Sequence, residues 1–200
     1  MKNIVFDLGG VLFARDKSKC TPELLEFFSF LRAPRMPLFW EEYDRGTSTL
    51  EEVTATISGM TGRPVETCAA VLRLAVDLQE PVKPTERLVG DLKAAGYRLY
   101  VLSNMSREFI DFLRRFPVYG LFDGEVVSCE EHTVKPEPRI YEILLERYGL
   151  TPSETLFIDD REMNIEAAAA LGIHGFLFDH RDPDAACDAL RRRLLQSDCI

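Results

Sequence analysis

The stretch that decides the fold stands near the start of the chain and reads Asn3-Ile-Val-Phe-Asp-Leu-Gly-Gly10. It is a short apolar run that ends at an acidic residue, Asp7, and is followed by a pair of glycines. An apolar run of this length is typical of a buried strand, and adjacent glycines indicate a turn. We therefore predict a buried strand over residues 2–8, with Asp7 at its carboxyl end.

Later segments repeat this strand pattern and alternate with helical patterns. The further predicted strands are residues 97–103, 125–128, 155–159 and 173–178. The predicted helices between or after them lie at about residues 84–96, 106–115, 137–148, 164–171 and 183–196. Strands and helices that alternate in this way predict an α/β fold, in which a parallel sheet carries helices on both faces.

One region, residues 20–80, departs from this alternation and contains no convincing strand. Thr21-Pro22 is a typical helix start, Ser48-Thr-Leu-Glu51 is a capping box, and residues 64–78 fit a further helix. The region therefore predicts a helical insertion placed directly after the first strand.

The composition and charge of the chain argue against several classes of protein. Its 200 residues are 46% hydrophobic, which excludes a disordered chain. Its formal net charge of −9 argues against a nucleic-acid-binding protein, which needs a basic surface. No apolar run approaches the ~20 residues of a membrane span, and scattered cysteines without a Cys-x-x-Cys pair favour a reducing compartment. We expect a cytoplasmic protein, a monomer or weak dimer, that binds neither nucleic acid nor a membrane.

Polar side chains follow the predicted strands at the edge where parallel α/β sheets bind ligands. They are Asp7, Ser103-Asn104, Lys135 and Asp159-Asp160. Taken singly, each could be a turn residue, a helix cap or a solvated lysine. Taken together at one edge, they predict a site, and adjacent carboxylates such as Asp159 and Asp160 repel each other unless a cation lies between them.

The charge of this cluster predicts a metal ion. The carboxylates of Asp7, Asp159 and Asp160, together with Lys135, carry a net charge of −2, which would repel a phosphate dianion. One Mg²⁺ neutralises the cluster, and Mg²⁺ binds one or two carboxylates together with substrate oxygens and waters.

Four segments in order carry a family resemblance. They are Phe6-Asp7-Leu-Gly-Gly-Val-Leu12, Val101-Leu-Ser-Asn104, Val134-Lys-Pro-Glu-Pro-Arg-Ile-Tyr141 and Phe157-Ile-Asp-Asp-Arg-Glu-Met-Asn164. They resemble the four motifs of the haloacid dehalogenase superfamily, and residues 15–80 resemble its small helical cap. Within that superfamily the chain resembles small bacterial sugar-phosphate phosphatases, including the α-D-glucose-1-phosphate type, and the phosphatase domain of soluble epoxide hydrolases.

The resemblance implies a Rossmann-like three-layer core formed by residues 1–14 and 81–200. Its five-stranded parallel sheet is expected to have the order 5-4-1-2-3 when the predicted strands are numbered along the chain.

The resemblance also implies roles in phosphate chemistry. Asp7 would be the nucleophile that forms an aspartyl-phosphate. Ser103 and the backbone of Asn104 would bind the phosphoryl oxygens. Lys135 would place a positive charge beside the transferring group and Asp7.

The Mg²⁺ ligands follow from the same resemblance. Asp7, Asp160 and the backbone carbonyl of Gly9 would ligate the ion, and Asp159 would ligate it directly or through water. Asn164 would support the orientation of Asp160.

One position departs from the family pattern, because Gly9 stands where a second aspartate commonly acts as general acid and base. The predicted cap offers Trp40, Tyr43 and Asp44, in an expected turn before its second helix. These residues either contact the substrate or form a half-buried packing face. Tyr43 or Asp44 is a candidate to restore proton transfer. Arg161 is either a substrate contact or a solvated helix residue.

The leading interpretation is a Mg²⁺-dependent phosphatase that acts on a small phosphorylated metabolite, with a sugar phosphate as the expected substrate, through an aspartyl-phosphate. A 2-haloacid dehalogenase is the alternative enzyme, since those proteins also use an aspartate nucleophile and lack the second aspartate. They need no metal, however, and the Asp159-Asp160 pair argues against them. A non-catalytic protein that binds a phosphorylated ligand is the remaining alternative, because Gly9 removes the usual general acid.

Overall fold

The computed structural model describes residues 1–32 and 36–196. Its centre is a parallel sheet of five strands in the order β5-β4-β1-β6-β7. The strands are β1 (Asn3–Phe6), β4 (Arg98–Ser103), β5 (Gly124–Val127), β6 (Thr155–Asp159) and β7 (His174–Leu177). Each overlaps a predicted strand, and their order is the predicted one, because β2 and β3 lie outside this sheet.

The register of the sheet brings the carboxyl ends of its central strands to one edge. The end of β1 pairs with Val101 of β4 and Ile158 of β6. The backbone N–H of Asp7 continues this pairing and donates to the carbonyl of Ile158 at 2.9 Å. Asp7, Ser103 and Asp159 are therefore neighbours, although most of the chain separates them in sequence.

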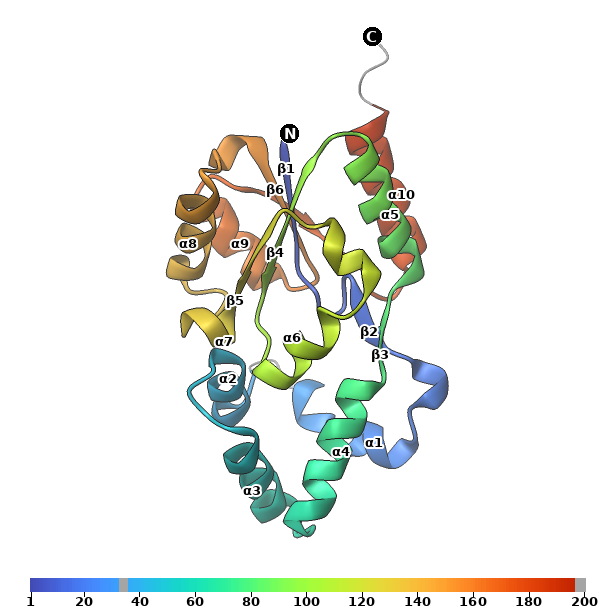
Figure 1. Cartoon of the computed structure of the whole chain (residues 1–200), viewed down its shortest axis with the longest axis vertical. Helices are drawn as coiled ribbons and strands as arrows, with labels where there is room; N and C mark the ends of the chain where they lie inside the picture. Colours follow the sequence, from blue (N-terminus) through green and yellow to red (C-terminus); the bar gives the residue numbers. More distant parts are fainter. Residues whose placement is uncertain (33–35, 197–200) are drawn as a thin grey trace.

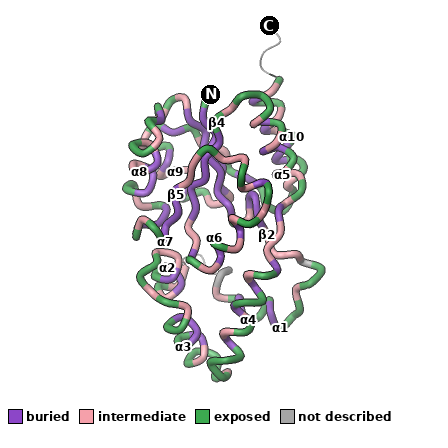
Figure 2. The backbone as a smooth tube through the Cα atoms, viewed as in Figure 1, coloured by how far each residue is buried: buried purple, intermediate pink, exposed green. Residues whose placement is uncertain are grey.

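Helices cover both faces of the sheet (Figure 1). They are α5 (Lys83–Ala94), α6 (Arg107–Leu113) and α10 (Pro183–Leu195) on one face, and α8 (Pro138–Tyr148) and α9 (Glu162–Ala170) on the other. Side chains alternate along β1, so Ile4 and Phe6 pack in the first apolar layer and Val5 packs in the second. The central strands β1 and β6 are buried at every residue, whereas the edge strand β7 has no buried residue. Figure 2 shows β4 as mostly buried between these layers. This is the three-layer α/β fold that the sequence predicts.

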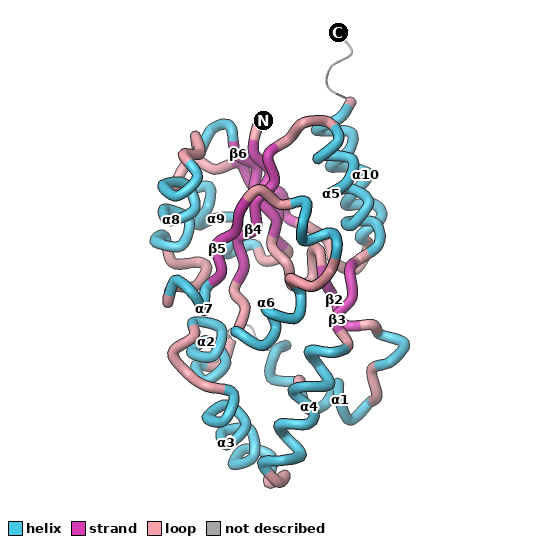
Figure 3. Tube along the Cα trace, viewed as in Figure 1, coloured by secondary structure: helices cyan, strands magenta, loops and turns pink. Residues whose placement is uncertain are grey.

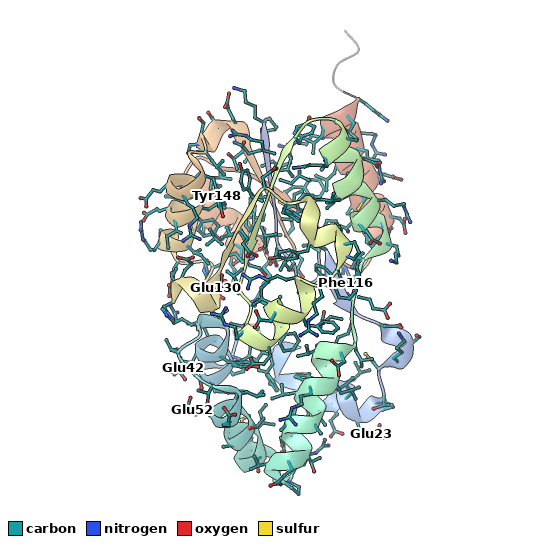
Figure 4. The ribbon with its side chains drawn as sticks, in the orientation of Figure 1. Glu23, Glu42, Glu52, Phe116, Glu130 and Tyr148 are labelled. Atoms are coloured by element: carbon teal, nitrogen blue, oxygen red, sulfur yellow. The ribbon has the colours of Figure 1, made fainter. Side chains whose placement is uncertain are left out.

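A group of helices lies beyond the carboxyl ends of the strands, at the lower end of the molecule in Figure 1. They are α1 (Pro22–Phe27), α2 (Leu38–Arg45), α3 (Leu50–Thr61) and α4 (Val65–Asp77). They share an apolar cluster that includes Phe28 and Trp40 and takes in Phe109 from α6. Exposed acidic residues such as Glu23 and Glu42 point outward from them (Figure 4). The division of the chain into two domains at residues 14 and 81 stays a prediction.

A short antiparallel strand pair joins the inserted helices to the core (Figure 3). It consists of β2 (Phe13–Arg15) and β3 (Gln79–Pro81). The prediction that residues 20–80 contain no strand was therefore wrong at its last residues. A strand of three residues is too short to show an alternating pattern, and only the pairing with β2 defines it.

The second and third inserted helices begin differently from the prediction. Residues 38–45 form α2 where the sequence predicted a turn, because Trp40 and Tyr43 share a helical face that packs into the apolar cluster. The capping box lies one residue later than predicted. Thr49 caps α3, and its hydroxyl and backbone N–H bond reciprocally with Glu52.

The remaining described elements are short. They are α7 (Ser128–Glu131) and 3₁₀ turns at Lys17–Lys19, Ser29–Arg32, Pro117–Leu121 and Pro152–Glu154. The cysteines in the described part of the chain, Cys20, Cys68, Cys129 and Cys187, are all free thiols. Within residues 1–32 and 36–196, no helix has both the length and the apolar character needed to cross a bilayer.

Candidate active site

Asp7 is held in one orientation by donors from three parts of the chain. Its Oδ1 atom accepts hydrogen bonds from the backbone N–H of Leu8 at 2.7 Å and from the Ser103 hydroxyl at 2.8 Å. The Lys135 ammonium lies 2.9 Å from the same oxygen. Among the described residues no donor is paired with Oδ2 of Asp7, so this oxygen is available to a ligand.

Lys135 is a buried cation between two carboxylates. Its Nζ lies 2.7 Å from Oδ2 of Asp159 and donates to the carbonyl of Leu102 at 3.0 Å, in addition to its pairing with Asp7. Burial lowers the pKa of Lys135, but the charges of Asp159 and Asp7 outweigh burial and the net shift is upward. Lys135 therefore holds a positive charge beside Asp7, and all of its ammonium protons are used within the protein.

Asp159 lies behind the cluster rather than at its surface. Its side chain is fully buried, and both of its oxygens accept hydrogen bonds from the Asn164 amide at 3.0 Å. Oδ1 also accepts the backbone N–H of Arg161 at 2.8 Å, while Oδ2 pairs with Lys135. The prediction that Asn164 orients Asp160 was wrong, because the first turn of α9 folds back onto the end of β6 and brings Asn164 to Asp159 instead.

The Asn104 side chain fixes the loop that carries Lys135. Its amide donates to the Lys135 carbonyl at 2.9 Å, and its own carbonyl accepts the Lys135 backbone N–H at 2.7 Å. This reciprocal pair joins the end of β4 to the loop before α8. The role of the Asn104 backbone toward phosphate stays a prediction.

Carboxylates gather at this edge as a divalent cation requires. One oxygen each from Asp7, Asp159 and Asp160 lies within 4.8 Å of the others. Burial raises the pKa of Asp7, and the charges of Asp159 and Asp160 add to that rise. Burial and the charge of Asp159 raise the pKa of Asp160 to about 6. Crowded carboxylates of this kind are stabilised in their ionised form by a cation.

The two glycines near Asp7, Gly9 and Gly10, complete the set of candidate Mg²⁺ ligands. Gly10 has a φ of 77°, and a Cβ there would lie 2.6 Å from Oδ2 of Asp160, so only glycine permits this approach. In the described chain the Gly9 carbonyl accepts no backbone hydrogen bond. Because Asp159 is saturated by protein donors, the set that fits Mg²⁺ is Asp7, Asp160 and the Gly9 carbonyl.

A cavity of about 610 Å³ lies between this edge of the sheet and the inserted helices. Its walls include Asp7, Lys135 and Asp160 from the core and Trp40 and Asp44 from α2. The inserted helices therefore contribute side chains to the same space as the carboxylate cluster.

Of the two predicted proton donors, Asp44 lines the cavity and Tyr43 does not. The Tyr43 hydroxyl donates to Glu108 of α6 at 2.6 Å, and its ring packs in the apolar cluster, so the packing alternative holds for this residue. Burial raises the pKa of Asp44 to about 7, although the backbone N–H of Ser106 lowers it, and the charge of Asp7 adds to the rise. Asp44 can therefore hold or release a proton near neutral pH.

The end of α2 is anchored to the core next to Asp44. Arg45 donates to both carboxylate oxygens of Glu137, at 2.9 and 2.7 Å, and these bonds lower the pKa of Glu137 to about 2. Gly46 packs so closely on α7 that a Cβ there would lie 2.4 Å from a backbone carbonyl. The carbonyl of Asp44 accepts a serine hydroxyl from α7. This anchor was not predicted from the sequence, where its only signal is a glycine directly after Arg45.

Several further cavity residues were not predicted from the sequence. They are Arg15, Phe28, Met36, Glu41, Gln79, Met105, Phe109, Pro136 and Met163. Pro136 and Met163 lie within two of the quoted motifs but were assigned no role, and the other residues lie outside those motifs. Arg161, left open by the sequence, also lines the cavity, and its charge lowers the pKa of Asp44 and of Asp160.

Known proteins resemble this chain over most of its length. A family model for haloacid dehalogenase-like hydrolases matches residues 1–172. The sesquiterpene phosphatase astK of Aspergillus oryzae is 29% identical over 192 residues, which cover 96% of this chain and 95% of that protein. The D-ribitol-5-phosphate phosphatase of Bacteroides thetaiotaomicron is 28% identical over 195 residues, which cover 88% of this chain and 91% of that protein.

Solved structures share the fold as well. The HAD family enzyme bt-2542 of Bacteroides thetaiotaomicron, in complex with magnesium and inorganic phosphate, has a TM-score of 0.70 at 28% identity. The match covers 90% of this chain and 95% of that one. A HAD-like family hydrolase from Porphyromonas gingivalis has a TM-score of 0.74 at 26% identity, over 96% of this chain and 98% of that one.

Proposed function

Because the chain belongs to the haloacid dehalogenase-like hydrolases, we propose that it is a Mg²⁺-dependent phosphatase that hydrolyses a small phosphomonoester through an aspartyl-phosphate at Asp7. The observation that carries this proposal is the bonding of Asp7, whose Oδ1 is held by Leu8, Ser103 and Lys135 while Oδ2 has no donor among the described residues. A carboxylate fixed in this way can attack phosphorus without reorienting. The two phosphatase relatives and the magnesium–phosphate complex of a related enzyme support the same reaction.

Each residue around Asp7 has a separate role in this proposal. Asp7, Asp160 and the Gly9 carbonyl would hold Mg²⁺, which supplies positive charge to the phosphoryl oxygens when bound. Lys135 favours the ionised form of Asp7. Asp159 touches neither substrate nor metal in this scheme, and it acts as a positioning residue through its ion pair with Lys135.

We assign the proton transfer to Asp44, because Gly9 offers no side chain. In the first step Asp7 forms a bond to phosphorus, the ester P–O bond breaks, and the leaving oxygen takes the Asp44 proton. In the second step the Asp44 carboxylate takes a proton from a water as the water oxygen bonds to phosphorus and the P–O bond to Asp7 breaks. This step releases inorganic phosphate, regenerates the Asp7 carboxylate and returns Asp44 to its protonated form. The cavity shared with Asp7 and the pKa of Asp44 near 7 support this role.

The test is the release of inorganic phosphate from a panel of phosphomonoesters that includes sugar phosphates. Activity with Mg²⁺ that disappears in EDTA and in Asp7→Asn would support the proposal. Metal-independent chloride release from 2-chloropropionate would instead identify a dehalogenase. Thermal stabilisation by phosphorylated ligands without phosphate release would identify a non-catalytic binding protein.

A further inference from the structure

Arg15 is a half-buried cation in the cavity wall, at the end of β2. Its guanidinium lies 4.5 Å from the centroid of the Phe28 ring. Burial lowers the pKa of Arg15, and no carboxylate is among the groups that oppose this shift. The described residues place no carboxylate within ion-pairing distance of it.

The other arginines of this region have anionic neighbours. Arg45 pairs with two glutamates, and Arg161 lies directly after Asp160, on whose pKa it acts. A guanidinium withdrawn from water without an anionic partner destabilises a protein. The unpaired Arg15 therefore indicates that its anion arrives with a ligand.

A series of aromatic rings extends from Arg15 to α6 in the cavity wall. Phe28 contacts Trp40, with ring centroids 5.9 Å apart, and Trp40 contacts Phe109 of α6 at 6.5 Å. All three rings line the cavity, and they are only 4%, 6% and 8% exposed. The other apolar side chains of the wall are Met36, Met105, Pro136 and Met163. The rings and Arg15 therefore line the same cavity as the carboxylates of Asp7 and Asp160.

We propose that the cavity binds phosphomonoesters whose leaving group has an apolar body and a second anionic group, and that Arg15 binds this second anion. The inference rests on the proposed phosphatase function and adds the class of leaving group. The rings of Phe28 and Phe109 offer apolar contact and no hydrogen-bond partner, and Trp40 adds a single N–H donor, which is fewer than the several hydroxyls of a sugar need. This aromatic part of the wall therefore favours a leaving group with an apolar body, which differs from the sugar expected from the sequence.

The experiment compares alkyl phosphates that differ in one property at a time, all with Mg²⁺ present. The probes are 4-carboxybenzyl, 4-phosphonobenzyl, 4-carbamoylbenzyl and glycerol phosphate. The carboxylate and the carboxamide are nearly identical in shape and differ in charge, and the phosphonate tests a second kind of anion. The value of kcat/KM is measured for the wild type, Arg15→Gln and Arg63→Gln. Arg63 is the matched control, because it lies 5.8 Å from the adjacent Phe27 ring but is not part of the cavity wall.

The wild type should prefer the anionic benzyl phosphates over the carboxamide by about tenfold to a hundredfold, as expected for a charge-assisted hydrogen bond. Arg15→Gln should lose this preference and leave the carboxamide within about twofold of wild type, whereas Arg63→Gln should keep the preference. Glycerol phosphate should be a poorer substrate than the carboxamide. A preference that survives Arg15→Gln, or faster turnover of glycerol phosphate than of the benzyl esters, would overturn the inference.

Binding measurements separate this inference from the proposed function. The corresponding methylene phosphonates cannot be hydrolysed. Titration calorimetry with these analogues measures the dissociation constants of the charged and neutral probes for the wild type and each variant. An Arg15-dependent affinity without phosphate release from any ester would contradict the phosphatase and retain the anion site. Phosphate release that does not change in Arg15→Gln, with equal affinities for charged and neutral analogues, would support the phosphatase and contradict the anion site.

Discussion

Neutralising Asp160 is expected to stabilise the metal-free protein. Burial and Asp159 raise the pKa of this carboxyl from 3.8 to about 6, and its side chain is 19% exposed. Since one pKa unit corresponds to about 1.4 kcal/mol, the ionised form destabilises the folded state by about 1–3 kcal/mol near neutral pH. Asp160→Asn keeps the shape and removes the charge. It should raise the free energy of unfolding by that amount, and the melting temperature by about 2–4 °C per kcal/mol.

The increase in the free energy of unfolding caused by Asp160→Asn should depend on pH. The pKa of Asp160 in the folded state lies above its unfolded value of 3.8, so at low pH both states bind the proton and the substitution has little effect. The destabilisation of the wild type develops as the pH rises from 3.8 to about 6, and it is complete above that range. The difference between wild type and Asp160→Asn should therefore be largest and constant at pH values above neutrality.

The neighbouring substitution Asp159→Asn should have the opposite effect. Asp159 is fully buried and pairs with Lys135 at 2.7 Å. Removing its charge is expected to lower the free energy of unfolding by up to about 3–5 kcal/mol, as for a broken buried ion pair. Both carboxylates stand at the end of the same strand, and the ion pair with Lys135 distinguishes the effect of Asp159 on stability from that of Asp160.

Urea unfolding near neutral pH, in EDTA and in excess Mg²⁺, measures these effects. Mg²⁺ at a hundred times its Kd should stabilise the wild type by about 2.7 kcal/mol through mass action, and Asp160→Asn should lose most of this increment. If both variants are less stable than the wild type in EDTA, the two carboxylates are structural and the reasoning about a metal site is refuted.

Further expected outcomes concern the proton donor and the anchor of α2. Asp44→Asn should lower kcat for alkyl phosphates by about 10²–10⁴-fold and leave aryl phosphates, whose leaving groups are less basic, within about tenfold. Adding Gly9→Asp should restore alkyl turnover, because a Cβ at Gly9 meets no atom within 4 Å; a folded double variant without rescue would argue against a missing acid. In the wild type, kcat for alkyl phosphates should fall as the pH rises through about 7, where Asp44 loses its proton, and a pH profile unchanged by Asp44→Asn would contradict this. Glu137→Gln should weaken the anchor at Arg45 and lower kcat/KM by about tenfold to a hundredfold through misplacement of Asp44, and an unchanged kcat/KM would show that the anchor is dispensable.

The sheet and the carboxylate cluster could be predicted because their signals are local. Each core strand is a short apolar run, and Asp7, Ser103 and Asp160 directly follow or end such runs. Parallel pairing then brings these ends to one edge, whatever the length of chain between them. Lys135 is predicted less directly, because it reaches Asp7 from a loop that is set by its pairing with Asn104.

The features that the sequence did not predict depend on contacts between distant elements. The orientation of Asp159 is decided by Lys135 and Asn164, and neither contact leaves a periodic pattern. The strands β2 and β3 are defined only by their pairing with each other. Arg15 belongs to this pair as the last residue of β2, and no pattern in the sequence predicted its place in the cavity.

The central claim is that Asp7 becomes phosphorylated during turnover, and acid quenching followed by mass spectrometry tests it most directly. Wild-type protein mixed with Mg²⁺ and a substrate phosphate should yield a peptide that carries a phosphoryl group on Asp7 at early times. The modified peptide should be absent in EDTA and in Asp7→Asn. Phosphate release by Asp7→Asn at the wild-type rate, or a phosphoryl group trapped on another residue, would contradict the account.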